Sequence, residues 1–317
     1  MRVTSRFAVR TVAEILESMD GESPFLVEGL IHSGPTLLSG APEAGKTYLA
    51  LSLARAIAEG DEYWLGRKLH NPGGRVVFGV TDPVSDKEMA RRLAGHPLAC
   101  EDVSAIRLHG GMERDDWEAL AWEVRKTDSR LFVLDNLLGA MPPGKDVNNS
   151  SEVRVVTDGL NRIIDAGCTV LMLHHTNKGG MGQSKTPLGS RYITAWPRAT
   201  MTLDKGSDSL RRLTYGGNEA AGGVLDLDFT PDAETGVWFT VTEKQQRPKK
   251  NRSDERQAEL RSIAAWLRSQ APSGPLKKPG AALARWALEN APEHWQKPSV
   301  DAWRITITRE LVKGGYL

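Results

Sequence analysis

The chain has 317 residues, of which 40% are hydrophobic and 26% charged, with a formal net charge of +1. These values are ordinary for a globular protein and leave room for one large α/β domain and a smaller one. No window approaches eighteen consecutive apolar residues, which excludes a membrane-spanning helix, and no apolar run after Met1 indicates a signal peptide. Cys100 and Cys168 have no metal-binding spacing, so we expect a cytoplasmic protein without a disulfide framework.

The charge is distributed unevenly along the chain. Residues 244–317 contain fifteen Lys or Arg and seven Asp or Glu, whereas the remainder contains 26 basic and 33 acidic residues. A basic C-terminal segment on an acidic body indicates contact with a polyanion. A solvated linker and helix surface would give the same pattern, because blocks of charge are often only tails.

Residues 1–30 are predicted to form a lead-in to the first domain. Residues 12–19 have the pattern of a short helix, and residues 25–30 resemble the segment that often precedes a nucleotide-binding domain. We therefore place the first domain at residues 31–245.

A phosphate-binding loop is predicted early in this domain. Gly40-Ala41-Pro42-Glu43-Ala44-Gly45-Lys46-Thr47 matches the pattern G-x-x-x-x-G-K-[ST] at every position. Residues 36–39 predict a short buried strand, and residues 48–59 predict a helix that stops at Gly60. This order directs backbone N–H groups and the positive end of the helix at phosphates. The sequence therefore predicts ATP binding by Gly40 to Thr47 and the adjoining Tyr48.

Two magnesium ligands are predicted. Lys46 is expected to reach the β- and γ-phosphates, and the Thr47 hydroxyl is expected to ligate Mg²⁺. Four apolar residues lead into Asp135 at a strand end, which is the usual position of the aspartate that holds Mg²⁺ directly or through water. An aspartate that merely caps the next element would show the same pattern.

The fold class predicted for the first domain is α/β, with a mostly parallel sheet. Continuous apolar runs predict further strands at 75–80, 131–135, 168–173 and 199–203. Helices are predicted between them at 86–93, 117–126 and 151–165. This alternation implies right-handed crossovers. Beyond residue 205, β-forming segments separated by turn residues predict hairpins at the sheet edge, at 210–215, 225–229 and 237–241.

His174 and His175 close the strand predicted at 168–173. Adjacent side chains of an extended chain point to opposite faces, so these histidines make a poor metal pair. We expect one of them to sense the γ-phosphate, although a structural role is also open. Residues 177–189 hold four glycines and two lysines. They predict a mobile basic loop that touches single-stranded DNA, or else a plain surface loop.

A second, smaller domain is predicted at 253–317 after a basic linker at 246–252. Amphipathic segments at about 254–269, 280–289 and 299–313 predict a compact helical or winged-helix-like domain. Large aromatic residues dominate small cores, so four tryptophans are expected inside it: Trp266, Trp286, Trp295 and Trp303. The basic charge indicates duplex DNA as a partner, and docking of a replication protein or another subunit would leave the same signature.

These motifs together resemble the RecA-fold AAA-type ATPases related to plasmid RepA hexameric replicative helicases. The resemblance covers about residues 25–205 and includes Leu65-Gly66-Arg67, and Asp82-Pro83 followed by Arg91-Arg92-Leu93. It implies a RecA-like domain that forms a homo-oligomer, such as a hexameric ring. It also implies ATP bound between subunits and single-stranded DNA in a central channel.

The sequence departs from the family pattern at two positions. Thr81 stands where the family has the glutamate that activates water, and loss of a general base typically costs ~10²–10⁴-fold in rate. Asp82 could substitute, although its side chain starts on the opposite face. Leu188 stands where the family has an arginine that reaches the neighbouring subunit's site, and Arg191 or Arg198 could supply that charge.

Three functions are compatible with this pattern. The first is a DNA-associated ATPase acting in replication or recombination of a plasmid, phage or mobile element. The second is a nucleotide-gated DNA-binding switch or loader with little or no hydrolysis, which the altered positions favour. A small-molecule kinase ranks third, because the arginine-rich lid that such kinases need is not evident.

Overall fold

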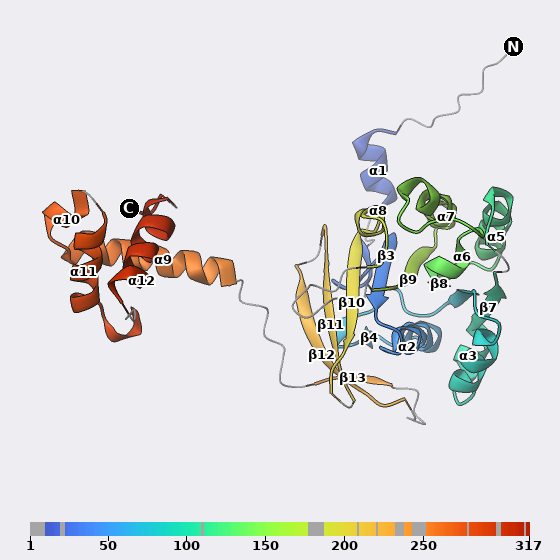
Figure 1. The fold of residues 1–317 in the computed structure, drawn as a ribbon. Coiled ribbons are helices and arrows are strands. Elements are labelled where there is room, and N and C mark those ends of the chain that lie inside the picture. The colour runs from blue at the N-terminus through green and yellow to red at the C-terminus, as the bar shows by residue number, and fades with distance from the viewer. Residues whose placement is uncertain are drawn as a thin grey trace, which may run out of the picture. The chain divides into compact units, whose positions relative to one another are not determined.

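The computed structural model describes residues 10–19, 23–108, 111–176, 187–207, 209–219, 221–231, 238–242, 252–277, 279–295, 299–313 and 315–317. The chain divides into two compact units, Met1–Gln246 and Arg247–Leu317. The larger unit is built on a sheet and the smaller one on helices (Figure 1). No helix in the described part of the chain is long and apolar enough to cross a membrane.

One twisted sheet organises the larger unit. Among the described residues its strand order is β13-β12-β11-β10-β3-β9-β8-β6-β7. The six parallel strands are β3 (Pro35–Gly40), β6 (Arg75–Val80), β7 (Val103–Arg107), β8 (Ser129–Asp135), β9 (Thr169–His175) and β10 (Ala199–Lys205). The antiparallel extension consists of β11 (Leu210–Gly217), β12 (Gly223–Phe229) and β13 (Phe239–Val241). The fold is α/β, with a mostly parallel sheet and edge hairpins, as the sequence predicts.

Helices cover both faces of this sheet. One face contacts α2 (Lys46–Glu59), with α3 (Ser85–Leu93) and α4 (Pro97–Asp102) packed in the same layer. The other face carries α5 (Arg114–Lys126), α6 (Leu137–Ala140), α7 (Ser150–Asp165) and α8 (Tyr192–Ala195). The strands are therefore buried on both sides, which is why they are continuous apolar runs.

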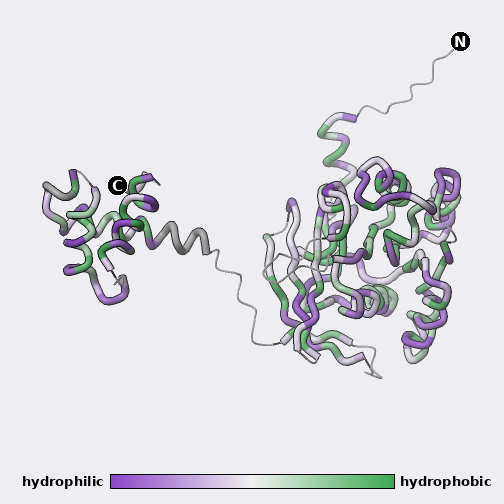
Figure 2. The backbone as a smooth tube through the Cα atoms, in the orientation of Figure 1, coloured by the Kyte–Doolittle hydropathy of each residue, from purple (hydrophilic) through white to green (hydrophobic). Residues whose placement is uncertain are grey.

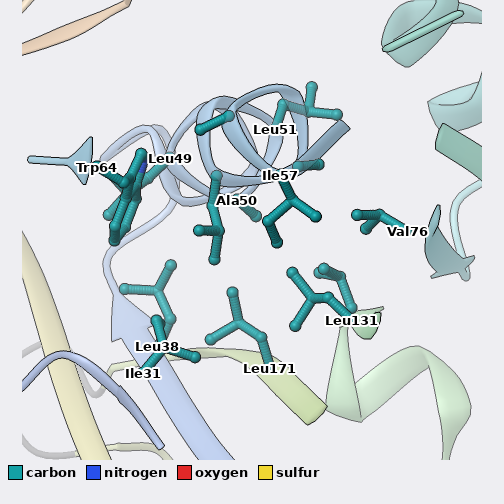
Figure 3. Close-up of a cluster of buried hydrophobic side chains, with 14 of the residues drawn as sticks. Ile31, Leu38, Leu49, Ala50, Leu51, Ile57, Trp64, Val76, Leu131 and Leu171 are labelled. Carbon is teal, nitrogen blue, oxygen red and sulfur yellow. The ribbon is translucent and has the colours of Figure 1, made fainter. Parts of the chain in front are cut away.

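Each face of the sheet has its own hydrophobic core. On the α2 face, Ile57 of the helix packs above Val76, Leu131 and Leu171 of three strands (Figure 3). On the opposite face, Trp117 of α5 is fully buried and its ring lies against Gly159 of α7. Figure 2 shows hydrophobic stretches gathered inside the larger unit, while its outer helices alternate between hydrophobic and hydrophilic.

The N-terminal segment differs from the prediction. Strand β1 (Phe25–Val27) pairs with β2 (Ile31–His32), and Leu26, Val27 and Leu30 are buried in the α2-side core. The lead-in predicted for residues 1–30 is therefore too long, because its last residues belong to the body. The preceding helix α1 (Val12–Ser18) buries none of its residues. The segment Leu65-Gly66-Arg67 is the turn of a small hairpin formed by β4 (Tyr63–Trp64) and β5 (Arg67–Lys68).

The smaller unit is helical throughout its described residues. It contains α9 (Arg252–Gln270), α10 (Ser273–Lys277), α11 (Ala281–Asn290), a 3₁₀ turn (Glu293–Trp295) and α12 (Val300–Ile305), which continues as a π-helix (Thr306–Val312). Trp303 is fully buried, and Trp266 contacts the other three tryptophans, so the expected aromatic core is present. Its described residues include no β-hairpin that would form a wing, so the winged-helix part of the prediction is not confirmed. The predicted linker lies almost entirely outside the described residues.

Candidate nucleotide-binding site

Most of the predicted site residues lie together at the carboxyl ends of the parallel strands. Parallel strands present their carboxyl ends on the same edge, where ligands of open α/β sheets bind. Here β3 runs into the phosphate loop, β6 into Thr81, β8 into Asp135 and β9 into the two histidines.

The phosphate loop depends on glycine at both ends. A Cβ atom at Gly40 would lie 2.6 Å from the carbonyl oxygen of Leu203 on the neighbouring strand, so a side chain has no space there. Gly45 has a φ of +101°, in the left-handed region that favours glycine, and α2 begins at the next residue. These glycines let the loop curl directly onto the start of a fourteen-residue helix.

Lys46 is held inside the loop. Its Nζ donates to the carbonyl oxygens of Gly40 at 3.0 Å and Ala41 at 2.9 Å, and it lies 3.4 Å from Nδ1 of His175. Burial lowers the pKa of the Lys46 ammonium, and the nearby carboxylate of Asp135 opposes that shift. The charge of Lys46 is thus kept at the place where a phosphate would be received.

Thr47 and Asp135 form the metal side of the site. The Thr47 hydroxyl donates to Oδ2 of Asp135 at 2.7 Å, joining two motifs that lie 88 residues apart. Burial raises the pKa of the Asp135 carboxyl, while the Thr47 hydrogen bond and the charge of Lys46 lower it. A hydroxyl and a carboxylate are the oxygen donors that Mg²⁺ prefers, so this pair fits the ion. No group of three or more His, Cys, Asp or Glu among the described residues could hold a metal alone, so phosphates and water would complete the coordination.

Thr81 does not face this metal pair. Its hydroxyl donates to the backbone oxygen of Asp135 at 3.1 Å and accepts from the N–H of Asn136 at 3.3 Å. A Cβ atom at Gly139 of α6 would lie 2.2 Å from the Thr81 oxygen, so the threonine packs tightly against that helix. The exposed Asp82 follows it. Its negative charge adds to the burial that raises the pKa of Asp135 and opposes the burial that lowers the pKa of His175. Asp82 is therefore the acidic side chain that acts electrostatically on the site from the β6 end.

The two histidines have different surroundings. His175 pairs in register with Gly40 and approaches Lys46, and burial and the charge of Lys46 lower its pKa. His174 is fully buried on the opposite face, where its Nε2 lies 2.7 Å from the carbonyl oxygen of Leu188. Of the two histidines, His175 therefore lies beside Lys46, whereas His174 contacts Leu188, which follows residues 177–186. Residues 177–186 lie outside the described part of the chain.

The two candidate arginines lie away from Lys46. Arg198 is exposed at the opposite end of the sheet, where its backbone N–H donates to the carbonyl oxygen of Pro35 at 2.8 Å and its charge adds to the burial that lowers the pKa of His32. Arg191 is exposed just before α8. No contact between either side chain and the phosphate loop is found among the described residues.

Comparison with known proteins agrees with this arrangement. A family model described as an AAA domain matches residues 6–181, more than half of the chain. The chain belongs to this AAA domain family. A crystal structure of the RadB recombinase is similar over 68% of this chain and 93% of its own, with 14% sequence identity and a TM-score of 0.46. No curated protein matches the chain.

Three side chains beyond the residues that match the AAA domain pack against the phosphate loop, and the sequence did not indicate them: Arg211, Phe229 and Phe239. We call these three residues the wall. Arg211 of β11 is only 5% exposed, and its Nε donates to the carbonyl oxygen of Ala44 at 3.0 Å. Its guanidinium lies 4.9 Å from the ring centre of Phe229, which stacks on Phe239. The Phe239 ring lies 3.3 Å from where a Cβ of Gly45 would be.

Only part of the signal for Arg211 was present in the sequence, where residues 210–215 predict a strand but do not show which of two adjacent arginines faces inward. Burial alternates along β11, so that Arg211 and Leu213 face inward while Arg212 faces out. An arginine on the inward side of an alternating strand needs a polar partner, and here the loop carbonyl supplies it.

Proposed function

We propose that this chain is an ATP-binding, DNA-associated ATPase of the RepA helicase type that acts in replication or recombination of a plasmid, phage or mobile element. The contact between Thr47 and Asp135, beside the buried Lys46, carries this proposal. It brings a metal-ligating hydroxyl, a metal-ligating carboxylate and a phosphate-binding ammonium into one site.

In this proposal Mg²⁺–ATP is bound by the chain's own groups. The N–H groups of the loop and Lys46 bind the phosphates, and Thr47 and Asp135 hold the ion. The ion neutralises charge on the phosphate oxygens when bound. Asp82 accepts a proton from the attacking water. Thr81 does not take this role, because its hydroxyl donates to the backbone of β8 and its side chain packs against α6.

A second function, a nucleotide-gated switch or loader with little hydrolysis, is favoured by one observation. The hydroxyl of Thr81 is directed to the Asp135 backbone, and no carboxylate takes the place of the family's glutamate at that position. In this version His175 reports the bound nucleotide to residues 177–189, which engage single-stranded DNA.

Self-association is supported by α1. Four exposed side chains, Val12, Ile15, Leu16 and Met19, follow the spacing of one helix face, with exposed fractions from 39% to 73%. A seven-residue helix is not stable alone in water, so this face needs a partner. We propose that a second copy covers it within a homo-oligomer, such as a hexameric ring, in which Arg191 or Arg198 reaches the neighbouring site.

We propose that this activity is cytoplasmic, and the free thiols of Cys100 and Cys168 support this location.

Steady-state ATP hydrolysis with and without single-stranded DNA tests the proposal, with Lys46→Ala as the blank. Turnover above the blank that rises with DNA supports the ATPase. Binding of ATP without turnover above the blank identifies the switch instead. Absence of ATP binding in the unaltered chain would refute both.

A further inference from the structure

One helix of the smaller unit has two contrasting faces. Residues 300–312 run as α12 and then without interruption as a π-helix. Trp303, Ile307 and Leu311 on its inner side are fully buried. On its outer side Arg304, Ile305, Arg309, Val312 and Lys313 are exposed, and we call these five residues the outer face.

The outer face is held rigidly. Trp303 packs with Trp266 of α9, so the helix cannot roll without losing core contacts. The Ser299 hydroxyl caps its start by accepting from the N–H of Ala302 at 3.2 Å. At its end, the N–H of Tyr316 donates to Leu311 at 2.7 Å, and Arg268 of α9 donates to the carbonyl oxygen of Tyr316.

The charge of the outer face is positive. Three of its five residues are cations, and only Arg304 has an ion pair given by the structure, with Asp301 at 3.2 Å. Both partners of that pair are more than half exposed, so it is weak and easily exchanged for another anion. Glu310 is the one other acidic residue of this helix, and it is partly buried. The surrounding segment, residues 244–317, has the excess of basic over acidic residues noted above.

We propose that the outer face binds duplex DNA, with the helix 300–312 lying in the major groove. The groove admits a single helix, phosphates pair with Arg309 and Lys313, and arginine is the commonest side chain to contact guanine there. Exposed Ile305 and Val312 suit the methyl groups of thymine. The preceding helix α11 packs against α12 and supports its inner side, which leaves the outer face available to DNA.

A protein partner fits the outer face less well. Burial of three cations against a protein requires matched anions, whereas DNA offers a regular row of phosphates. This inference does not depend on the ATP site.

The test measures binding of the full chain to a blunt 30-base-pair duplex of mixed sequence by fluorescence anisotropy, across a range of salt concentrations. The measurement is made without added nucleotide, so it does not depend on the ATP site, which separates this result from failure of the ATPase proposal. The triple variant Arg304→Ala/Arg309→Ala/Lys313→Ala should bind at least on the order of tenfold more weakly. Its plot of log affinity against log salt should be shallower by about 1.8, for the two lost phosphate contacts of Arg309 and Lys313.

Lys277→Ala is the matched control. This exposed lysine lies on α10, apart from α12 in Figure 1, and its loss should change affinity less than about twofold. Tryptophan fluorescence checks that the triple variant keeps its aromatic core. Duplex binding by a folded triple variant equal to that of the unaltered chain would overturn the proposal. So would absence of duplex binding by the unaltered chain, which would leave a protein as the occupant of the outer face.

Discussion

Replacement of Arg211 by leucine tests whether the edge hairpins shape the phosphate loop. Leucine fits a buried strand position but cannot donate to the Ala44 carbonyl or place a charge over Phe229. The carbonyl of Ala44 would lose a buried hydrogen-bond donor. We expect the loop to leave the conformation that receives phosphates.

The structure sets the size of this effect. A buried hydrogen bond from a charged donor contributes about 1.5–3 kcal/mol, and a cation–π contact about 0.5–2 kcal/mol. If the whole energy of this hydrogen bond stabilises the loop conformation that binds nucleotide, its loss raises the Kd for ATP by about 10- to 100-fold, because each 1.4 kcal/mol is a factor of ten in Kd.

Calorimetric titration with Mg²⁺–ATP measures this Kd, and thermal unfolding measures stability in parallel. Arg211→Lys keeps the charge and should fall between the unaltered chain and Arg211→Leu. Arg212→Leu is the matched control on the same strand, because Arg212 is half exposed and pairs with Asp226 at 2.8 Å, away from the loop. It should lower the midpoint of unfolding and leave the Kd unchanged. A normal Kd for Arg211→Leu would show that the wall supports only the fold.

Three other predictions concern the site itself. Lys46→Ala should abolish nucleotide binding, and unchanged ATP affinity would contradict our assignment of the loop. Asp82→Asn should lower turnover by ~10²–10⁴-fold with little change in ATP affinity; Thr81→Val, which removes only the hydroxyl, should lower it far less, and the reverse order would refute Asp82 as the base. Burial raises the pKa of Asp135, so in the nucleotide-free protein this carboxyl favours folding at low pH, and that contribution is lost as the pH rises through the raised pKa. Asp135→Asn should therefore become increasingly more stable than the unaltered chain as pH rises, and the difference between their Tm values should grow. The same variant should bind Mg²⁺–ATP more weakly. A difference in Tm that shrinks as pH rises would contradict the direction of the pKa shift.

The sheet could be predicted wherever its strands are buried on both faces. Strand β6 occupies the predicted residues 75–80, and β3, β8, β9 and β10 contain or largely overlap their predicted runs. Strand β7 was missed because it lies at the sheet edge, where Ser104 and Arg107 are exposed and no continuous apolar run forms. Helix α4 was missed because it has only six residues and begins with Pro97.

The site could be predicted where a motif fixes the chemistry. Thr47 and Asp135 are in contact, as their motifs require. Asp135 ends strand β8, and Thr47 lies at the start of α2, directly after the loop that follows the parallel strand β3. The sequence could not separate His174 from His175, since either side of β9 could have faced the loop. Arg211 required knowledge of which face of β11 is inward, which tertiary packing decides.

The sheet order has a practical consequence for dividing this protein. The family match ends at residue 181, yet β3, which carries the phosphate loop, lies between β9 and β10. A fragment cut at that boundary would keep Lys46, Thr47 and Asp135 but leave β3 with a row of unpaired backbone groups, a template for aggregation. The smallest fragment worth expressing as an ATP-binding module should extend through β13, to residue 242.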